Sequence, residues 1–312
     1  MRIVLLTNGL RPVALGFPSF PGVPVGIINW DSDHAEAPAW KHTLQIGAAR
    51  LRGRVYGSLH HLCQHHGLDH IEIPQKNPQL LKQVLNDWQV DLVITSGCPI
   101  VPMDALAEVP HGGINLHPSL LPAYRGGNPF FWQAYDCVKS TGCTVHTLTA
   151  SADRGDLLGQ TVVKRQDGWN RHAWSHFIEG GAGVPLLKKV VTEIIAGTIQ
   201  RDAQPEASPT RDAKSFKISK LGEIIDPDEM SIYSLWNILC LYESCPESLG
   251  KIKGWRRWFL WIPSSQQAHS QKKGYGLTAR AKGIHWLLKI PAGTITLTPR
   301  FSLRHFLAKA LS

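Results

Sequence analysis

The sequence predicts an α/β protein with a doubly wound, mostly parallel sheet, followed by a small, basic, β-barrel-like C-terminal domain. Over the first two thirds of the chain, short apolar runs alternate with stretches of helical periodicity, as in a parallel sheet with crossover helices. Beyond residue 250, short aromatic and basic runs are separated by glycine and proline, which is typical of a small barrel. With 312 residues, 43% of them hydrophobic, the chain can bury two cores.

The elements expected in the first part follow the chain in order. Apolar runs predict strands at residues 2–6, 23–29, 71–73, 90–95, 113–116, 144–148 and 159–163. Helical spacing of apolar residues predicts helices at 51–66, 78–88 and 173–196, with a helical turn at 103–108. Gly67 and Gly197 follow two of these helices, and glycine readily forms the left-handed cap that ends a helix.

A polar segment divides the chain. Residues 201–215 include two prolines and show no periodicity, which favours an interdomain linker. We therefore predict a first domain over residues 1–203, a linker over 204–216 and a C-terminal domain over 217–312. The C-terminal domain should contain a helix at 231–241 and strands at 255–262, 276–280, 283–290 and 294–298.

The net charge of +9 is unevenly distributed. Nearly all of the excess lies beyond residue 200, and no acidic residue follows Glu247. A basic region over residues 250–312 favours an anionic partner such as RNA or a phosphorylated substrate, although a merely basic surface is the alternative.

Cysteine usage and hydropathy indicate the compartment. The six cysteines form no Cys-x-x-Cys pair and are too sparse for a disulfide scaffold. No apolar run approaches the ~18 residues that a membrane span needs. We expect a reduced, cytoplasmic protein.

The stretch GGINLHPSLLPAYRGG carries the candidate chemistry. Asn115 and His117 alternate on the predicted strand 113–116 and its end, so they point to the same side, and Pro118 marks that end. Ligands of open α/β sheets bind at the carboxyl ends of the strands. An amide donor beside a titratable imidazole suits acyl chemistry, because the amide stabilises an oxyanion and the imidazole moves a proton.

A carboxylate is expected as the third member of this site. The stretch TVHTLTASADRGDLLG supplies two candidates, Asp153 and Asp156, on the loop after the strand 144–148. Spacing alone does not choose between them.

Three motifs together resemble the folate-dependent formyltransferases, in particular methionyl-tRNA formyltransferases and also amino-sugar N-formyltransferases. They are NLHPSLLPAYRG, TGCTVH and ADRGDLLGQ, in that order. The resemblance implies a Rossmann-like formyltransferase domain, catalytic Asn115, His117 and Asp153, and 10-formyltetrahydrofolate as the formyl donor. It implies no metal.

The resemblance also implies where ligands bind. The folate pocket would be lined by Cys98, Pro99, Ile100 and Val101 on one loop and by Ala150 and Ala152 on another. Substrate would meet Ser119, Arg125 and Gly126, with a structural brace for the proline-rich loop as the alternative role of Arg125.

The acceptor stays open at the level of sequence. The chain beyond residue 215 resembles the C-terminal domain of methionyl-tRNA formyltransferases, and its basic residues could meet tRNA phosphates: Lys251, Lys253, Arg256, Arg257, Lys272 and Lys273. The basic loop that those enzymes place after the second strand is absent. We therefore consider two acceptors, a small amine such as a nucleotide-linked amino sugar and methionyl-tRNA. A catalytically vestigial, RNA-binding relative is the alternative function.

A histidine cluster lies on the predicted helix 51–66 and its exit: His60, His61, His65, His66 and His70. Pairs at helical spacing can chelate a transition metal, but we expect a solvated helix face.

Overall fold

The computed structural model describes residues 1–31, 55–242, 260–268, 277–282 and 285–301. The chain forms two compact units. The first unit comprises Met1–Gly127, Ser140–Val163 and Ser175–Asp212, and the second comprises Asn128–Lys139, Lys164–Trp174 and Ala213–Ser312. Each unit is therefore assembled from more than one stretch of the chain.

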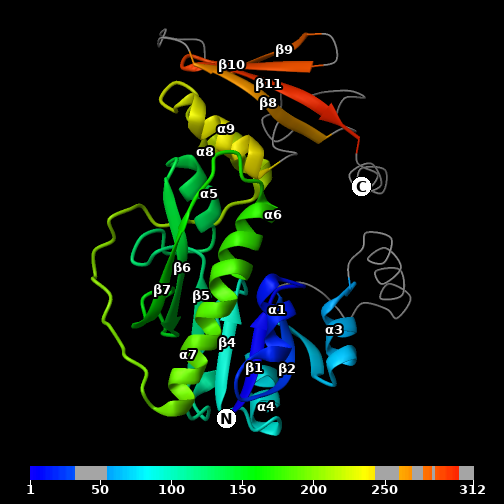
Figure 1. Cartoon of the computed structure of the whole chain (residues 1–312), viewed down its shortest axis with the longest axis vertical. Coiled ribbons are helices and arrows are strands. Elements are labelled where there is room, and N and C mark those ends of the chain that lie inside the picture. Colours follow the sequence, from blue (N-terminus) through cyan, green and yellow to red (C-terminus); the bar gives the residue numbers. More distant parts are fainter. Residues whose placement is uncertain (32–54, 243–259, 269–276, 283–284, 302–312) are drawn as a thin grey trace. The chain divides into compact units, whose positions relative to one another are not determined.

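A seven-stranded sheet organises the first unit (Figure 1). Its strands, in chain order, are β1 (Arg2–Thr7), β2 (Val23–Asp31), β3 (Asp69–Pro74), β4 (Leu92–Ser96), β5 (Gly113–His117), β6 (Ser140–Thr147) and β7 (Leu157–Lys164). The order across the sheet is β3-β2-β1-β4-β5-β6-β7. The pairs among β1 to β5 are parallel, and β6 runs antiparallel to β5. The predicted mostly parallel sheet is confirmed.

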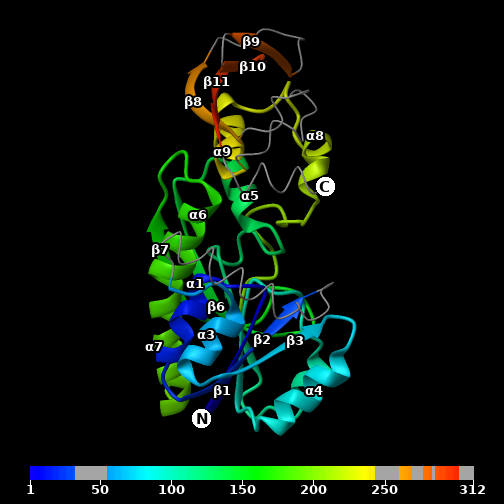
Figure 2. The same ribbon diagram turned by 90° about the vertical axis from the view of Figure 1, so that its right-hand side faces the viewer.

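Helices cover both faces of this sheet (Figure 2). On one face, α4 (Pro78–Asp87) and the short helix η2 (Met103–Leu106) pack against alternate residues of β1, Val4 and Leu6. On the other lie α1 (Pro12–Gly16), α3 (Leu59–His66) and α7 (Val184–Ala196), with the short helix η1 (Phe17–Ser19) after α1. Successive residues of β1 are buried on both sides, so β1 is a continuous apolar run, as buried parallel strands require.

Two predicted helices have different bounds in the structure. The helix predicted at 51–66 begins at Leu59, because the Ser58 hydroxyl accepts the N–H of His61 at 3.1 Å and so caps the helix; residues 51–54 lie outside the described part. The helix predicted at 173–196 is divided into α6 (Arg171–Trp174), the π-helix η3 (Ser175–Gly183) and α7. Pro185 lacks the N–H of a continuous α-helix, and three glycines precede it.

The second unit combines short helices with an antiparallel sheet. The helices are α5 (Pro129–Tyr135), α6, η4 (Ile218–Lys220), α8 (Leu221–Ile224) and α9 (Ile232–Leu241). The strands are β8 (Leu260–Ala268), β9 (Thr278–Lys282), β10 (His285–Ile290) and β11 (Gly293–Arg300), in the order β8-β11-β10-β9. The predicted helix at 231–241 is confirmed, with Ser231 as its cap. Within the described residues the predicted barrel is a four-stranded antiparallel sheet.

The described part of the chain contains no helix with both the length and the hydropathy of a membrane span.

Candidate active site

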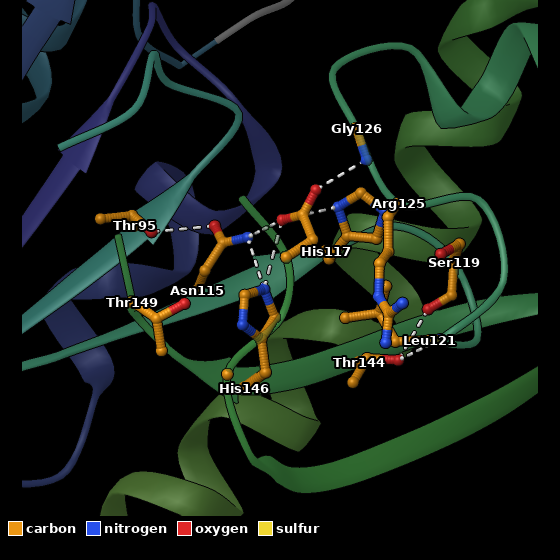
Figure 3. A network of polar contacts seen from close by, with 12 residues as sticks. Thr95, Asn115, His117, Ser119, Leu121, Arg125, Gly126, Thr144, His146 and Thr149 are labelled. Atoms are coloured by element: carbon orange, nitrogen blue, oxygen red, sulfur yellow. Dashed lines mark hydrogen bonds and ion pairs between the residues drawn. The ribbon is translucent and has the colours of Figure 1, made fainter. Parts of the chain in front are cut away.

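The site lies at the carboxyl end of β5, between β4 and β6. Asn115 pairs with Thr95 of β4 and with His146 of β6 in the sheet register. His117 is the last residue of β5. Figure 3 shows Thr95, Asn115, His146 and His117 directed toward one another from three strands. The alternation predicted for Asn115 and His117 therefore brings both side chains into one site.

The Asn115 amide is held in one orientation. Its Oδ1 accepts a hydrogen bond from the Thr95 hydroxyl at 2.8 Å, so its Nδ2 faces His146. His146 Nδ1 lies 2.8 Å from the Thr147 carbonyl oxygen, which can only accept, so Nδ1 carries the proton. His146 Nε2 is then an acceptor for Asn115 Nδ2 at 3.1 Å. This leaves the second N–H of the amide for another acceptor.

Asp153 joins the two histidines and the amide. Its Oδ1 lies 3.5 Å from His117 Nδ1, 3.4 Å from His146 Nε2 and 3.4 Å from Asn115 Nδ2. Its Oδ2 accepts the N–H of Gly126 at 2.8 Å. Burial raises the pKa of Asp153, but the two histidines in their protonated form and the Gly126 N–H outweigh it and lower the pKa to about 2. Asp153 is therefore an anchored carboxylate at neutral pH.

The structure also distinguishes Asp153 from Asp156, the two candidate carboxylates between which sequence spacing does not choose. Asp156 is tied to β6 through its backbone: its N–H donates to the Thr147 hydroxyl at 2.9 Å, and its carbonyl accepts the Thr147 N–H at 2.9 Å. Asp153 is the carboxylate that contacts Asn115 and His117.

His117 is arranged as a proton acceptor. Its Nε2 lies 2.9 Å from the carbonyl oxygen of Tyr124, so Nε2 carries the proton of the neutral ring. Its Nδ1 faces Asp153. Burial lowers the pKa of His117, and the Asp153 carboxylate opposes this shift. A neutral imidazole with an unprotonated Nδ1 can take up a proton, and the adjacent carboxylate stabilises the cation that results.

The proline-rich loop after β5 is braced by buried hydrogen bonds (Figure 3). The Thr144 hydroxyl of β6 donates to the Ser119 carbonyl at 2.7 Å and accepts the N–H of Leu121 at 3.1 Å. The Ser119 hydroxyl, on a fully buried residue, donates to the Ala123 carbonyl at 2.6 Å. For Ser119 this geometry favours loop support over substrate contact.

Arg125 is also engaged within the protein. It is 4% exposed, and its guanidinium donates to the Gln204 side chain and to the carbonyls of Pro205 and Glu206. This geometry favours the brace alternative for Arg125. Gly126, at φ 121°, adopts a backbone conformation that suits glycine and brings its N–H to Asp153.

The loop expected to line a folate pocket follows β4. Gly97 has φ 58°, its carbonyl accepts a hydrogen bond from Arg11 at 3.3 Å, and the Ile100 carbonyl accepts one from the Trp30 indole at 3.4 Å. The Ile100 side chain is 62% exposed, whereas Val101 is buried. Ala150 and Ala152, on the second expected wall, are exposed. Burial raises the pKa of the Cys98 thiol to about 12, so Cys98 is not a thiolate at neutral pH.

The histidine cluster on α3 surrounds a tyrosine. The Tyr56 hydroxyl lies 2.8 Å from His66 Nε2, and the Tyr56 ring lies 5.5–5.8 Å from the rings of His61, His65 and His66. The described residues contain no group of three or more His, Cys, Asp or Glu side chains placed to hold a metal ion.

Three residues of the site or its support were not singled out from the sequence: Thr95, His146 and Gln204. His146 lies on a predicted strand, but only the sheet register reveals that it faces Asn115. Gln204 is the first residue of the segment 204–216 that the sequence predicts to be a linker.

Sheet order and site geometry together define a class: a doubly wound α/β protein that places an amide, two imidazoles and a carboxylate at the carboxyl edge of its sheet. Residues 55–167 of the chain match the sequence model of the formyl transferase family.

Sequence relatives of the chain are named methionyl-tRNA formyltransferases. The chain is 32% identical over 185 residues to the methionyl-tRNA formyltransferase of Halalkalibacterium halodurans, covering 53% of this chain and 58% of that protein. It is 32% identical over 181 residues to that of Syntrophomonas wolfei, covering 57% of this chain and 56% of the relative. The matches thus span little more than half of each relative.

Solved structures share the fold. An N-formyltransferase from Helicobacter canadensis, in complex with folinic acid and dTDP-3-aminofucose, has a TM-score of 0.58 at 13% identity, over 96% of this chain and 99% of that chain. A glycinamide ribonucleotide transformylase from Symbiobacterium toebii has a TM-score of 0.52 at 22% identity, over 66% of this chain and 94% of that chain.

Proposed function

We propose that the protein is an N-formyltransferase that moves a formyl group from 10-formyltetrahydrofolate to the nitrogen of an acceptor amine. The observation that carries the proposal is the convergence of Asn115, His117 and Asp153 at the end of β5. Methionyl-tRNA formyltransferase relatives and the family match support the same reaction class.

The residues present fit a reduced folate. The loop after β4 offers backbone groups and the exposed apolar side chain of Ile100, which suit a flat, polar ring edge and its apolar face. The Asp153 turn, with the exposed Ala150 and Ala152 before it, would supply the second wall. The folate supplies the activated formyl carbon.

Each side chain then has a distinct role. Asn115 Nδ2 donates to the formyl oxygen as negative charge develops on it. His117 Nδ1 accepts the proton that the attacking amine loses, and that proton is returned to the departing folate nitrogen. Asp153 holds the resulting imidazolium, and His146 and Thr95 keep the amide aimed at the reacting oxygen.

A spectrophotometric assay tests this function. The protein is mixed with 10-formyltetrahydrofolate and candidate amines, led by methionyl-tRNA and a nucleotide-linked amino sugar, and the absorbance change as tetrahydrofolate forms is followed. We expect turnover with one of these acceptors. Absence of turnover with every amine, together with tight, salt-dependent RNA binding, would establish the vestigial RNA-binding alternative instead.

We consider two acceptors, methionyl-tRNA and a nucleotide-linked amino sugar, and the antiparallel sheet offers a cationic face for the phosphates of either. Arg280, Lys282 and Lys289 are exposed, and the register places them on the same face of β9 and β10. The opposite face is apolar, with Leu288 and Ile295 fully buried. A face with three cations suits the phosphates of tRNA or of a nucleotide-linked sugar. The six basic residues singled out between Lys251 and Lys273 lie outside the described residues.

We further propose that the C-terminal domain, residues 217–312, is a small barrel-like domain. The boundaries 1–203 and 204–216 for the first domain and linker remain predictions.

Charge neutralisation distinguishes the acceptors. In the full-length triple variant Arg280→Gln, Lys282→Gln and Lys289→Gln, we expect weaker binding of methionyl-tRNA and a shallower salt dependence, by about 0.7–0.9 in the slope of log K against log salt for each lost phosphate contact. The measurement is a binding titration at several salt concentrations. A matched control replaces the exposed Lys76, Lys164 and Lys189 with glutamine. An unchanged slope in the first variant rules out this face as a tRNA contact.

A further inference from the structure

Gln204 connects the two loops that hold Asp153. Its Nε2 donates to the backbone carbonyls of Asp153 at 3.1 Å and Gly155 at 2.6 Å. Its Oε1 accepts two hydrogen bonds from Arg125, from Nε at 3.2 Å and from Nη2 at 2.9 Å. One amide side chain therefore contacts the Asp153 turn with its donors and the loop after β5 with its acceptor.

Both of these loops determine where the Asp153 side chain lies. Gly126, the neighbour of Arg125, donates its N–H to Asp153 Oδ2 at 2.8 Å. The turn itself carries the carboxylate. The position of the Asp153 oxygens relative to His117 and His146 therefore depends on the relative position of these two loops. Gln204 holds the two loops together through its hydrogen bonds to both.

The Asp153 turn needs such support. Asp153 has φ 54°, a left-handed backbone conformation that L side chains rarely adopt. A side chain at Gly155 would collide with the backbone of Thr147, so the turn is packed against β6 on one side. On the other side, its two carbonyl oxygens receive the Gln204 amide. Carbonyls held in this way keep the strained turn in a single conformation.

Residues around Gln204 extend the same contact. Asp202 forms a β-bridge with Leu157, and the Ser208 hydroxyl donates to the Pro122 carbonyl at 2.9 Å. The Thr210 hydroxyl accepts the N–H of Tyr124 at 2.7 Å, next to the carbonyl that orients His117. Residues 202–210, polar and without periodicity in the sequence, thus lie along the proline-rich loop of the site.

We propose that Gln204 is a positioning residue: it acts through the Asp153 turn to hold the carboxylate at the distance from His117 that proton transfer requires. The inference rests on the proposed formyl transfer for its kinetic part. Its structural part, the effect of Gln204 on the environment of His117, is independent of any substrate.

The kinetic test uses Gln204→Glu. Glutamate has nearly the same size and still accepts from Arg125, but it cannot donate to the carbonyls of Asp153 and Gly155. We expect kcat to fall about 10–100-fold, since a small misplacement of a catalytic group has an effect of this size. The KM for the acceptor should stay within about threefold, and the melting temperature should stay close to that of the wild type because the Arg125 contact persists.

A matched control is Gln200→Glu, the same substitution at an exposed glutamine whose side chain donates to the Thr198 carbonyl at 3.5 Å. We expect its kcat to remain within about twofold of the wild type. A Gln204→Glu variant that also stays within twofold overturns the proposal.

The second readout needs no turnover. In Gln204→Met, which is neutral and lacks both donors and the acceptor, NMR titration of histidine-labelled protein should show a lower pKa for His117 than in the wild type. The sign follows because the Asp153 carboxylate raises that pKa, and a released turn moves the carboxylate away. An unchanged His117 titration overturns the proposal. If the wild type transfers formyl to no amine, formyl transfer fails while this titration still decides the role of Gln204.

Discussion

Replacing Asn115 with alanine is expected to lower kcat for formyl transfer by about 10²–10³-fold, the usual effect of removing one preorganised oxyanion donor. The loss should be this large because Thr95 and His146 hold the amide in one orientation, with its second N–H directed toward Asp153 in the site. Binding of folinic acid should change by less than about threefold, since the expected folate loop after β4 is untouched. Single-turnover rates and a fluorescence titration measure the two quantities.

The control for this variant is Asn86→Ala. Asn86 is an exposed asparagine of α4 that donates to Glu108 at 2.7 Å, remote in the fold from the end of β5. Its rate should equal that of the wild type. Near-normal single-turnover rates in Asn115→Ala would remove the assignment of Asn115 as the oxyanion donor.

Replacing Asp153 with asparagine is expected to lower kcat by about 10²–10⁴-fold at neutral pH. Asparagine keeps the shape of the side chain but loses the negative charge that stabilises protonated His117. One of its two terminal atoms also becomes a donor, which can hydrogen-bond the unprotonated His117 Nδ1 and so compete with proton uptake there. Steady-state rates across pH measure both consequences.

The pH dependence of kcat/KM tests the same variant, because the direction in which its acid limb moves is predicted. Under the proposed mechanism, activity requires unprotonated His117. Burial lowers the pKa of His117 from its ordinary 6.5, so the acid limb of kcat/KM should lie below pH 6.5. The Asp153 carboxylate raises the pKa of His117, so its removal should move this limb to still lower pH. A limb that moves upward would contradict the assigned pairing.

Asp156→Asn is the matched control for Asp153→Asn. Asp156 lies three residues away on the same loop and contacts β6 through its backbone, which the substitution leaves intact. We expect its rate to remain within a few-fold of the wild type. If Asp156→Asn instead abolished turnover while Asp153→Asn did not, the catalytic carboxylate would be Asp156.

The sequence predicted those features that depend on neighbours along the chain. Burial on both faces makes β1 and β4 continuous apolar runs, so their positions follow from composition within a few residues. Alternation along β5 placed Asn115 and His117 on one side, and the structure brings them together. Where a single local contact competes with periodicity, prediction was wrong: the Ser58 cap, rather than the apolar spacing, sets the start of α3.

Tertiary structure alone decided which side chains complete the site. His146 meets Asn115 because β6 runs antiparallel to β5 in a particular register, 31 residues along the chain. Gln204 reaches the Asp153 turn across 51 residues, from a segment that composition marked as a linker. Hydrogen bonds between such distant groups depend on how whole strands and loops pack, and no periodicity in the chain encodes that packing. The sequence by itself therefore determined the strand, the amide and the imidazole, while the fold determined the partners that orient them.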